Sequence, residues 1–234
     1  AIANILIQKG YEVSGSDVKE SDVIERFRKM GATVHIGHNA DYVQGVDAVV
    51  RSTAIREDNP EIVAAKEQGI TILHRSDIVK AVLDVTNGIA VAGAHGKTST
   101  TSMIGQILVE GQMEPTVIIG GEVDYLKGSS CLGKGEYSVV EADESDGSFL
   151  KLRPKTIVIT NIEDDHMDHY KTMENLLNAF CQFVETLPVD GKAVVCGDND
   201  NIRYVMSKVE RQFITYGLEE SNDYVAKNIH YEDS

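Results

Sequence analysis

The sequence predicts an α/β fold built on parallel β-sheets and divided into two successive domains. Apolar strand patterns recur about every 20 to 25 residues with helical patterns between them, which is typical of βαβ units. A second series of this kind starts at Gly88, after the polar stretch Asp84–Asn87. The length of 234 residues suits one to two domains. We therefore expect one domain over residues 1–87 and another over residues 88–234.

The first domain begins with a helical pattern. Apolar residues at positions 2, 5 and 6 share one helical face, and Lys9-Gly10 is typical of a helix end. Tyr11–Val13 predicts a strand that ends in Ser14-Gly15-Ser16-Asp17. Because no strand precedes the opening helix, we expect the start of this domain, a strand and its turn, to be missing from the chain.

Helices and strands then alternate through the first domain. Asn59 is placed to cap a helix that has Pro60 at its first position, and Ser76 is placed to cap the next helix. The predicted helices are Asp22–Met30, Glu61–Gln68 and Asp77–Leu83, and the predicted strands are Thr33–Ile36, Asp47–Val50 and Ile70–Leu73.

The second domain repeats this alternation. Its predicted strands are Ile89–Ala92, Thr116–Ile119, Tyr137–Val140, Ile157–Thr160, Ala193–Cys196 and Phe213–Tyr216, and its predicted helices are Lys97–Glu110, Met173–Thr186 and a shorter one near Asn201–Val209. Residues 222–234 carry weak structural signals and no helix stop, so we expect this domain to continue beyond the chain.

Composition excludes several classes of function. The net charge of −15 and the lack of a basic stretch argue against a nucleic-acid partner, since such proteins neutralise phosphates with Lys and Arg. No apolar run reaches the ~18 residues that a membrane span needs. Three widely spaced cysteines predict neither a disulfide framework nor a zinc site and suit a reducing cytosol.

The strongest local signal is Gly93-Ala94-His95-Gly96-Lys97-Thr98, between a predicted strand and a predicted helix. Glycines let backbone N–H groups approach phosphate oxygens, and a helix N-terminus favours negative charge. In such a turn Lys97 would contact the β- and γ-phosphates, and the Thr98 hydroxyl would bind Mg²⁺. The spacing departs from the usual pattern, because the first glycine stands two residues closer to the second.

Polar residues also follow two further predicted strands. Glu141-Ala142-Asp143-Glu144-Ser145-Asp146 supplies four carboxylates, which suit Mg²⁺, although a solvated acidic loop is an alternative. Thr160–His169 includes His166, which suggests a second ion but is also compatible with a surface or loop-stabilising residue. Strand ends of one parallel sheet meet at one edge, so we expect these segments to converge on the Gly93–Thr98 turn.

Two strand ends of the first domain are weaker candidates for a nucleotide-sugar site. Asp17 ends a strand at the place where Rossmann-like folds carry an acidic residue that contacts a nucleotide sugar. Ser52 and Thr53 end another strand and could offer hydroxyl or N–H groups to a diphosphate. Polar residues are common at strand ends, so neither placement is specific alone.

Together these segments resemble the Mur ligase family, the ATP-dependent amide-forming enzymes of peptidoglycan synthesis. The motifs that carry the resemblance are Gly15-Ser16-Asp17, Asn59-Pro60-Glu61, Gly93–Thr101, Glu141–Leu150 and Thr160–Asp168. The resemblance covers nearly the whole chain. It implies a Rossmann-like, parallel-sheet UDP-sugar-binding domain over 1–87 and much of a P-loop-type ATPase domain over 88–234.

The resemblance also implies substrates and residue roles. The activity it implies is ATP-dependent addition of L-alanine to UDP-N-acetylmuramate in the cytoplasm through an acyl phosphate, with two Mg²⁺ ions. Lys97, Glu141 and His166 would be catalytic, and Thr98, Glu141 and His166 would bind metal. The implied ATP-binding residues are Gly93, Ala94, His95, Gly96, Lys97, Thr98 and Ser99, and the implied UDP-sugar-binding residues are Ser16, Asp17, Ser52 and Thr53.

Alternatives remain open at this point. A muropeptide-recycling ligase that adds a tripeptide to the same UDP-sugar shares most of these motifs, and a non-catalytic UDP-sugar or nucleotide sensor could keep the same scaffold. A weak homodimer is also left open. We expect the 234-residue chain, as a fragment, not to turn over alone.

Overall fold

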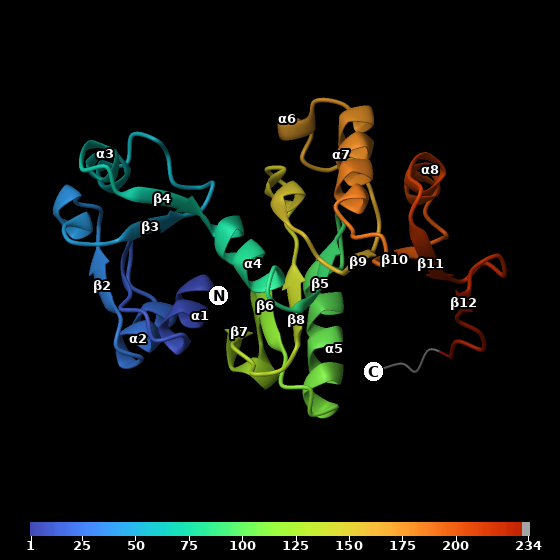
Figure 1. The fold of residues 1–234 in the computed structure, drawn as a ribbon, viewed down its shortest axis with the longest axis horizontal. Coiled ribbons are helices and arrows are strands. Elements are labelled where there is room, and N and C mark those ends of the chain that lie inside the picture. The colour runs from blue at the N-terminus through green and yellow to red at the C-terminus, as the bar shows by residue number, and fades with distance from the viewer. Residues whose placement is uncertain (231–234) are drawn as a thin grey trace.

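The computed structural model describes residues 1–230, which form two α/β units joined side by side (Figure 1). The first unit contains two separate pairs of parallel strands. Its helices are α1 (Ile2–Gln8), α2 (Asp22–Lys29), α3 (Pro60–Glu67) and α4 (Arg75–Leu83), and the 3₁₀ helix η1 covers Ala40–Val43. The strand pairs are β1 (Ser14–Asp17) with β2 (Thr33–Ile36), and β3 (Ala48–Arg51) with β4 (Thr71–His74).

The second unit is built on one eight-stranded sheet in the order β12-β11-β10-β9-β5-β8-β6-β7. All neighbouring strands are parallel except β6 and β7. The strands are β5 (Asn87–Ala92), β6 (Thr116–Val123), β7 (Gly128–Cys131), β8 (Tyr137–Glu141), β9 (Thr156–Ile159), β10 (Lys192–Cys196), β11 (Gln212–Gly217) and β12 (Tyr224–Val225). The helices are α5 (Lys97–Glu110), α6 (Met167–Tyr170), α7 (Met173–Glu185) and α8 (Asp200–Lys208), with 3₁₀ helices η2 (Asp124–Leu126) and η3 (Ser148–Lys151).

Helices cover both faces of the large sheet, which its nearly continuous apolar strands require. Along β5, Ala90 and Ala92 belong to the larger core with α7 and α8, whereas Val91 packs on the α5 side. Alternate residues of a strand point to opposite faces, so this division follows from the pleat. The central strands β5, β8 and β9 are buried, and their carboxyl ends lie at one edge of the sheet.

The structure confirms the α/β class and most predicted elements, and it corrects some. The strand predicted at Tyr11–Val13 is instead Ser14–Asp17, because pairing with β2 begins at Ser14. The helix expected to start after Ser76 starts at Arg75. His74 is its N-cap, and Asp77 accepts the His74 N–H in a capping box.

Two short edge strands were not predicted, β7 and β12. The sequence of β7 is small and polar, so its strand state depends on pairing with β6 rather than on propensity. The weak signals predicted over residues 222–234 include β12, and residues 231–234 of that stretch lie outside the described part of the chain.

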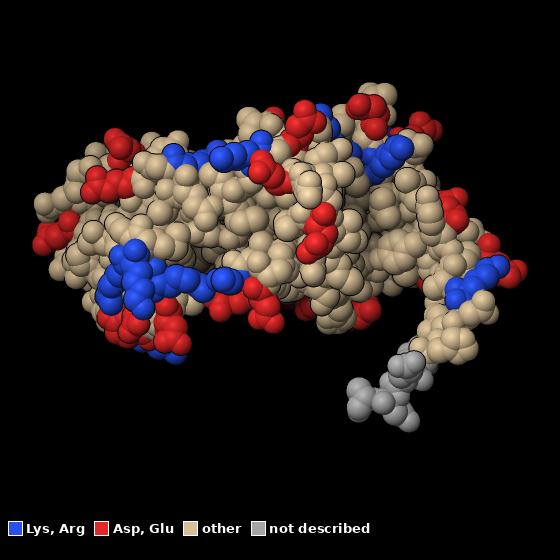
Figure 2. All heavy atoms as spheres, turned by 90° about the horizontal axis from the view of Figure 1, so that it is seen from below, with Lys and Arg blue, Asp and Glu red and all other residues tan. Residues whose placement is uncertain are grey.

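Charged side chains of both signs share the surface. On the face that Figure 2 shows, Lys and Arg occur in short groups beside Asp and Glu and form no continuous basic surface. Among the helices of residues 1–230, none combines the length and the apolar character needed to cross a bilayer.

Candidate functional site

The turn between β5 and α5 is held by residues that follow β9. Asn161 accepts the N–H of Ala94 with its carbonyl (3.2 Å) and the N–H of His95 with Oδ1 (2.9 Å). Thr160 Oγ1 donates to the carbonyl of His95 (2.6 Å). Gly93 has φ +132°, and a Cβ there would lie 2.2 Å from Thr160 Oγ1. The shape of the turn therefore depends on a glycine and on the neighbouring strand end.

This turn leads directly into the N-terminus of α5. Gly96 is the N-cap residue in the left-handed conformation (φ +81°) and makes no side-chain cap. The first turn of a helix leaves its N–H groups without intrahelical acceptors, here those of Lys97, Thr98 and Ser99. An anion at this position would receive backbone donors and the favourable end of the helix dipole.

Lys97 folds back over its own turn. Its Nζ donates to the carbonyl of Gly93 (2.6 Å), lies 3.5 Å from the carbonyl of Ala94 and donates to Glu144 Oε1 (2.7 Å). The ammonium carries three donors, and two of them have acceptors at short distance, the Gly93 carbonyl and Glu144. The Lys97 side chain is itself largely buried.

Glu144 is the carboxylate that contacts Lys97. Its side chain is only 2% exposed, and its Oε2 is buried with no hydrogen-bond partner. Burial raises the pKa of Glu144 above its usual range, while the hydrogen bond from Lys97 opposes that rise. The Tyr170 hydroxyl donates to the Glu144 carbonyl, and burial followed by the nearby Glu144 charge raises the pKa of Tyr170. Sequence order alone did not show this burial, because the contacts of Glu144 with Lys97 and Tyr170 join segments far apart in the chain.

Glu141 contacts Thr98, the residue that follows Lys97 in α5. Thr98 Oγ1 donates to Glu141 Oε2 (3.0 Å), and the N–H of Gly120 donates to the same oxygen (2.9 Å). Strand β8 thus places one carboxylate beside the Thr98 hydroxyl, as its position at the strand end predicts.

His166 also lies near Glu144. Its Nε2 is 3.7 Å from Glu144 Oε1 and 3.6 Å from Asp165 Oδ2. The residue adopts φ +56° as the N-cap of α6, an uncommon conformation for a residue with a side chain. Lys97 and His166 therefore approach the same Glu144 oxygen from different elements.

The donor set is compatible with Mg²⁺ that is also bound by a nucleotide. Within residues 1–230, no three His, Cys, Asp or Glu side chains are grouped closely enough to hold an ion by themselves. Mg²⁺ usually takes one or two protein carboxylates and completes its shell with waters and substrate phosphates. The Thr98–Glu141 pair suits such an ion. Glu144 Oε2, which has no hydrogen-bond partner, offers a further oxygen ligand on the carboxylate that His166 approaches.

The candidate residues of the first unit lie in two places. Ser16 Oγ donates to Glu61 Oε1 (2.6 Å), and His38 Nδ1 lies 2.9 Å from the same hydroxyl. Asp17 is exposed at the end of β1. Ser52 and Thr53 follow β3, at a different strand end. The described residues do not bring Ser16 and Thr53 into contact.

Thr53 contacts the second unit. Its hydroxyl donates to Asp146 in the loop after β8 and lies 3.0 Å from His74 Nε2. Ser148 N also donates to Asp146 (2.8 Å). Burial alone would raise the pKa of Asp146, but the hydrogen bonds from Ser148 and Thr53 outweigh it and hold that pKa below its usual range.

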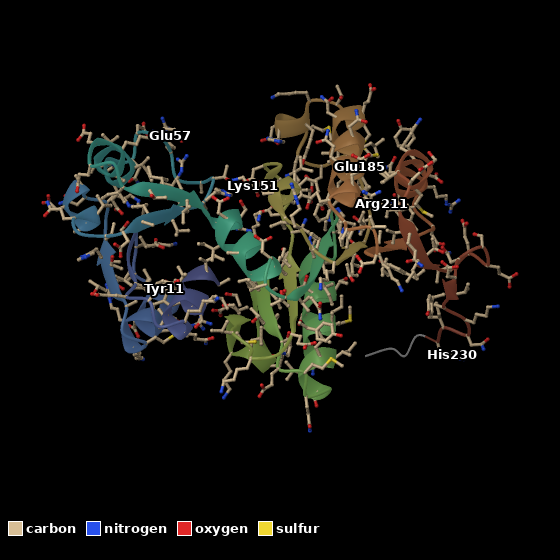
Figure 3. All side chains as sticks on the ribbon, in the orientation of Figure 1. Tyr11, Glu57, Lys151, Glu185, Arg211 and His230 are labelled. Atoms are coloured by element: carbon tan, nitrogen blue, oxygen red, sulfur yellow. The ribbon has the colours of Figure 1, made fainter. Side chains whose placement is uncertain are left out.

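Other contacts of this loop region also join the two units. Arg75 lies 3.5 Å from Asp143, and Lys151 Nζ donates to Asp77 (3.1 Å). Figure 3 shows Lys151 at this junction, beside α4. The loop that carries Glu144 is thus held from both sides, by the first unit and by α5. Sequence reasoning missed these contacts, because pairings between distant segments leave no local pattern.

This architecture defines the class of protein. A parallel sheet with a phosphate-type turn after its central strand, and an ammonium, a hydroxyl, carboxylates and an imidazole around that turn, is the arrangement of a P-loop-type nucleotide-binding α/β protein. The profile of the Mur ligase middle domain matches residues 91–234, and that of the Mur ligase family catalytic domain matches residues 1–85. The chain belongs to the Mur ligase family.

Individual relatives agree with this placement. The UDP-N-acetylmuramate–L-alanine ligase of Desulfatibacillum aliphaticivorans is 45% identical over 228 residues, which cover 97% of this chain and 50% of the relative. The chain spans about half the length of the curated relatives it matches.

Two solved structures share the fold of this chain at more than 25% sequence identity. The UDP-N-acetylmuramate–alanine ligase of Thermotoga maritima has a TM-score of 0.83 at 29% identity, and the match covers 94% of this chain and 50% of that one. The UDP-N-acetylmuramate:L-alanyl-γ-D-glutamyl-meso-diaminopimelate ligase of Neisseria meningitides has a TM-score of 0.85 at 26% identity, and the match covers 92% of this chain and 73% of that one.

Proposed function

We propose that this chain forms the UDP-sugar-binding and ATP-binding part of a ligase that joins L-alanine to UDP-N-acetylmuramate in the cytoplasm. In this proposal residues 1–87 bind the UDP-sugar and residues 88–234 bind ATP. The relatives that are about 45% identical carry the name of this activity and support the choice of substrates.

The observation that carries the proposal is the convergence around the turn after β5. Lys97 and His166 both approach Glu144, and the adjacent Thr98 donates to Glu141. A nucleotide sensor would need the backbone cradle but not this set of charged groups, so the arrangement favours catalysis.

An amide cannot form directly from a carboxylate, because oxide is a poor leaving group. In the proposed reaction the substrate carboxylate oxygen forms a bond to the γ-phosphorus of ATP, and the bond from that phosphorus to the bridging oxygen breaks to release ADP. The amine nitrogen of L-alanine then attacks the acyl carbon, phosphate leaves, and the nitrogen loses a proton.

The residues of this chain would position two anions against each other. Backbone N–H groups at the start of α5 would bind the phosphates, and Lys97 would neutralise charge on the transferred group. Thr98 and Glu141 would hold one Mg²⁺ and His166 would help to hold a second, and these ions would offset the repulsion between carboxylate and triphosphate.

The test is Lys97→Ala in the full-length ligase that contains this chain. We expect turnover, measured as ADP release with UDP-N-acetylmuramate and L-alanine, to fall by about a hundredfold or more. The melting temperature should also fall, because Glu144 loses its partner, so circular dichroism at the assay temperature checks that the variant is folded. A variant within about threefold of wild type would show that the phosphate assignment is wrong.

A second candidate is the recycling activity that adds a tripeptide to the same UDP-sugar. The structural similarity to the Neisseria meningitides ligase favours it, since that TM-score slightly exceeds the one for the alanine ligase. Assays with L-alanine and with L-alanyl-γ-D-glutamyl-meso-diaminopimelate as alternative amines separate the two. Turnover with the tripeptide alone would replace the alanine proposal.

A further inference from the structure

Glu144 stands apart from the other carboxylates of the molecule by its burial. Within residues 1–230 it is the one charged residue that is buried, and its Oε2 has no partner. Removing a carboxylate from water is costly unless other groups compensate. Lys97 donates to one oxygen of the Glu144 carboxylate, and the other oxygen has no donor. The buried position of the side chain therefore depends on the contact with Lys97.

The backbone around Glu144 fixes its position. The Tyr170 hydroxyl and the N–H of Gly147 (3.1 Å) both donate to the Glu144 carbonyl. The flanking residues Asp143 and Asp146 contact the first unit. The main chain at Glu144 is therefore held from several sides.

A bound phosphate would share the Lys97 ammonium with Glu144. The short contacts of this ammonium are with the Gly93 carbonyl (2.6 Å) and the Glu144 carboxylate (2.7 Å), whereas the Ala94 carbonyl lies at 3.5 Å, so the positive charge is already partly neutralised by Glu144. Glu144 and phosphate are both anions, and the main chain of Glu144 is held by Tyr170 and Gly147. The two compete for one ammonium.

We propose that Glu144 is a positioning residue that holds the Lys97 ammonium against the turn and competes with nucleotide phosphate for it. The inference rests on the proposed function, because it takes Lys97 as the group that binds phosphate. Its consequence is a weaker interaction between Lys97 and the bound triphosphate before reaction. Lys97 interacts fully with the phosphoryl group only as charge shifts during transfer. This lowers the free-energy barrier measured from the bound state.

This role predicts opposite changes in binding and in turnover. Glu144→Gln keeps the shape and an acceptor for Lys97 but removes the competing charge. We expect the Kd for ATP in the presence of Mg²⁺ to fall about threefold or more, since a close charged competitor is lost. We expect kcat to fall by about the same factor, because extra binding in the ground state is not matched in the transition state.

The experiment uses the full-length ligase that contains this chain. Isothermal titration with ATP and Mg²⁺ gives Kd, steady-state ADP release gives kcat and KM, and thermal melting shows that each variant is folded. Glu110→Gln is the matched control, because it makes the same substitution at an exposed carboxylate at the opposite end of α5. We expect the control to keep the wild-type Kd and kcat.

Each outcome of these measurements either supports the inference or overturns it. A merely structural role for Glu144 would weaken ATP binding and turnover together, so an unchanged or increased Kd in Glu144→Gln overturns the inference while the proposed function stands. Wild-type ligase that binds no ATP overturns both. If Glu144→Gln does not fold, Glu144→Asp retracts the carboxylate by one methylene from its 2.7 Å contact and must shift Kd and kcat downward by a smaller factor, or the inference fails.

Discussion

The close approach of Gly93 to the segment after β9 allows a quantitative test by Gly93→Ala. A Cβ would lie 2.2 Å from Thr160 Oγ1 and 2.8 Å from the carbonyl oxygen of Asn161, and the residue has φ +132°. The unfavourable φ costs about 1–2 kcal/mol for a residue with a side chain. Displacing Thr160 breaks its hydrogen bond to His95, which adds about 1 kcal/mol.

The expected loss in the free energy of unfolding is thus about 2–3 kcal/mol, which corresponds to a fall in melting temperature of about 4–12 °C for a domain of this size. Thermal melting followed by circular dichroism measures it. Gly96→Ala is the matched control, because Gly96 has φ +81° but no atom would lie within 4 Å of a Cβ added there. That variant carries only the conformational cost, about 1–2 kcal/mol.

The contact between Gly93 and Thr160 is tested by comparing the loss of stability in Gly93→Ala with that in Gly96→Ala. If Gly93→Ala destabilises the protein no more than Gly96→Ala does, the contact with Thr160 is not a tight one, and the account of how β9 shapes the turn is wrong. Replacement of Thr160 by alanine in the Gly93→Ala background should recover only part of the loss, because the Asn161 carbonyl remains close.

Two further predictions concern the junction between the units. Asp77→Ala removes the capping-box acceptor for His74 and the partner of Lys151, so urea unfolding should show a loss of about 1–2 kcal/mol. Asp146→Asn should lower stability at neutral pH. Because the pKa of Asp146 is depressed in the folded protein, its contribution is complete above the unfolded value of about 4 and disappears as the pH falls through the folded value. The difference between wild type and Asp146→Asn should therefore shrink below about pH 4 in melts across pH, and a constant difference would contradict the assignment.

Much of the fold follows from local pattern. The helix Lys97–Glu110 and the strand Thr33–Ile36 have the predicted bounds, because glycines stand at or near the ends of both segments. The edge strand β7 could not be predicted, since its residues are small and polar and only pairing with β6 makes them a strand. The start of α4 was missed because histidine is an unusual N-cap.

The candidate site was predictable to a similar degree. The positions of Lys97, Thr98 and Glu141 follow from the rule that parallel strands end at a common edge. The partner of Lys97 was not predictable, because Glu144 lies beyond the end of β8 and its position depends on contacts with distant segments. The roles assigned to these residues in catalysis and metal binding remain predictions.

The edge of the large sheet at β7 has a consequence for solution behaviour. The Asn4 amide of α1 donates to the carbonyl of Ser130 (2.8 Å), and Gln8 Oε1 accepts the N–H of Leu132 (2.8 Å). These are the main-chain groups that a strand from another molecule would otherwise use. Helix α1 therefore blocks the addition of a strand from another molecule at β7. A chain shortened past Gln8 would present an open sheet edge and tend to aggregate.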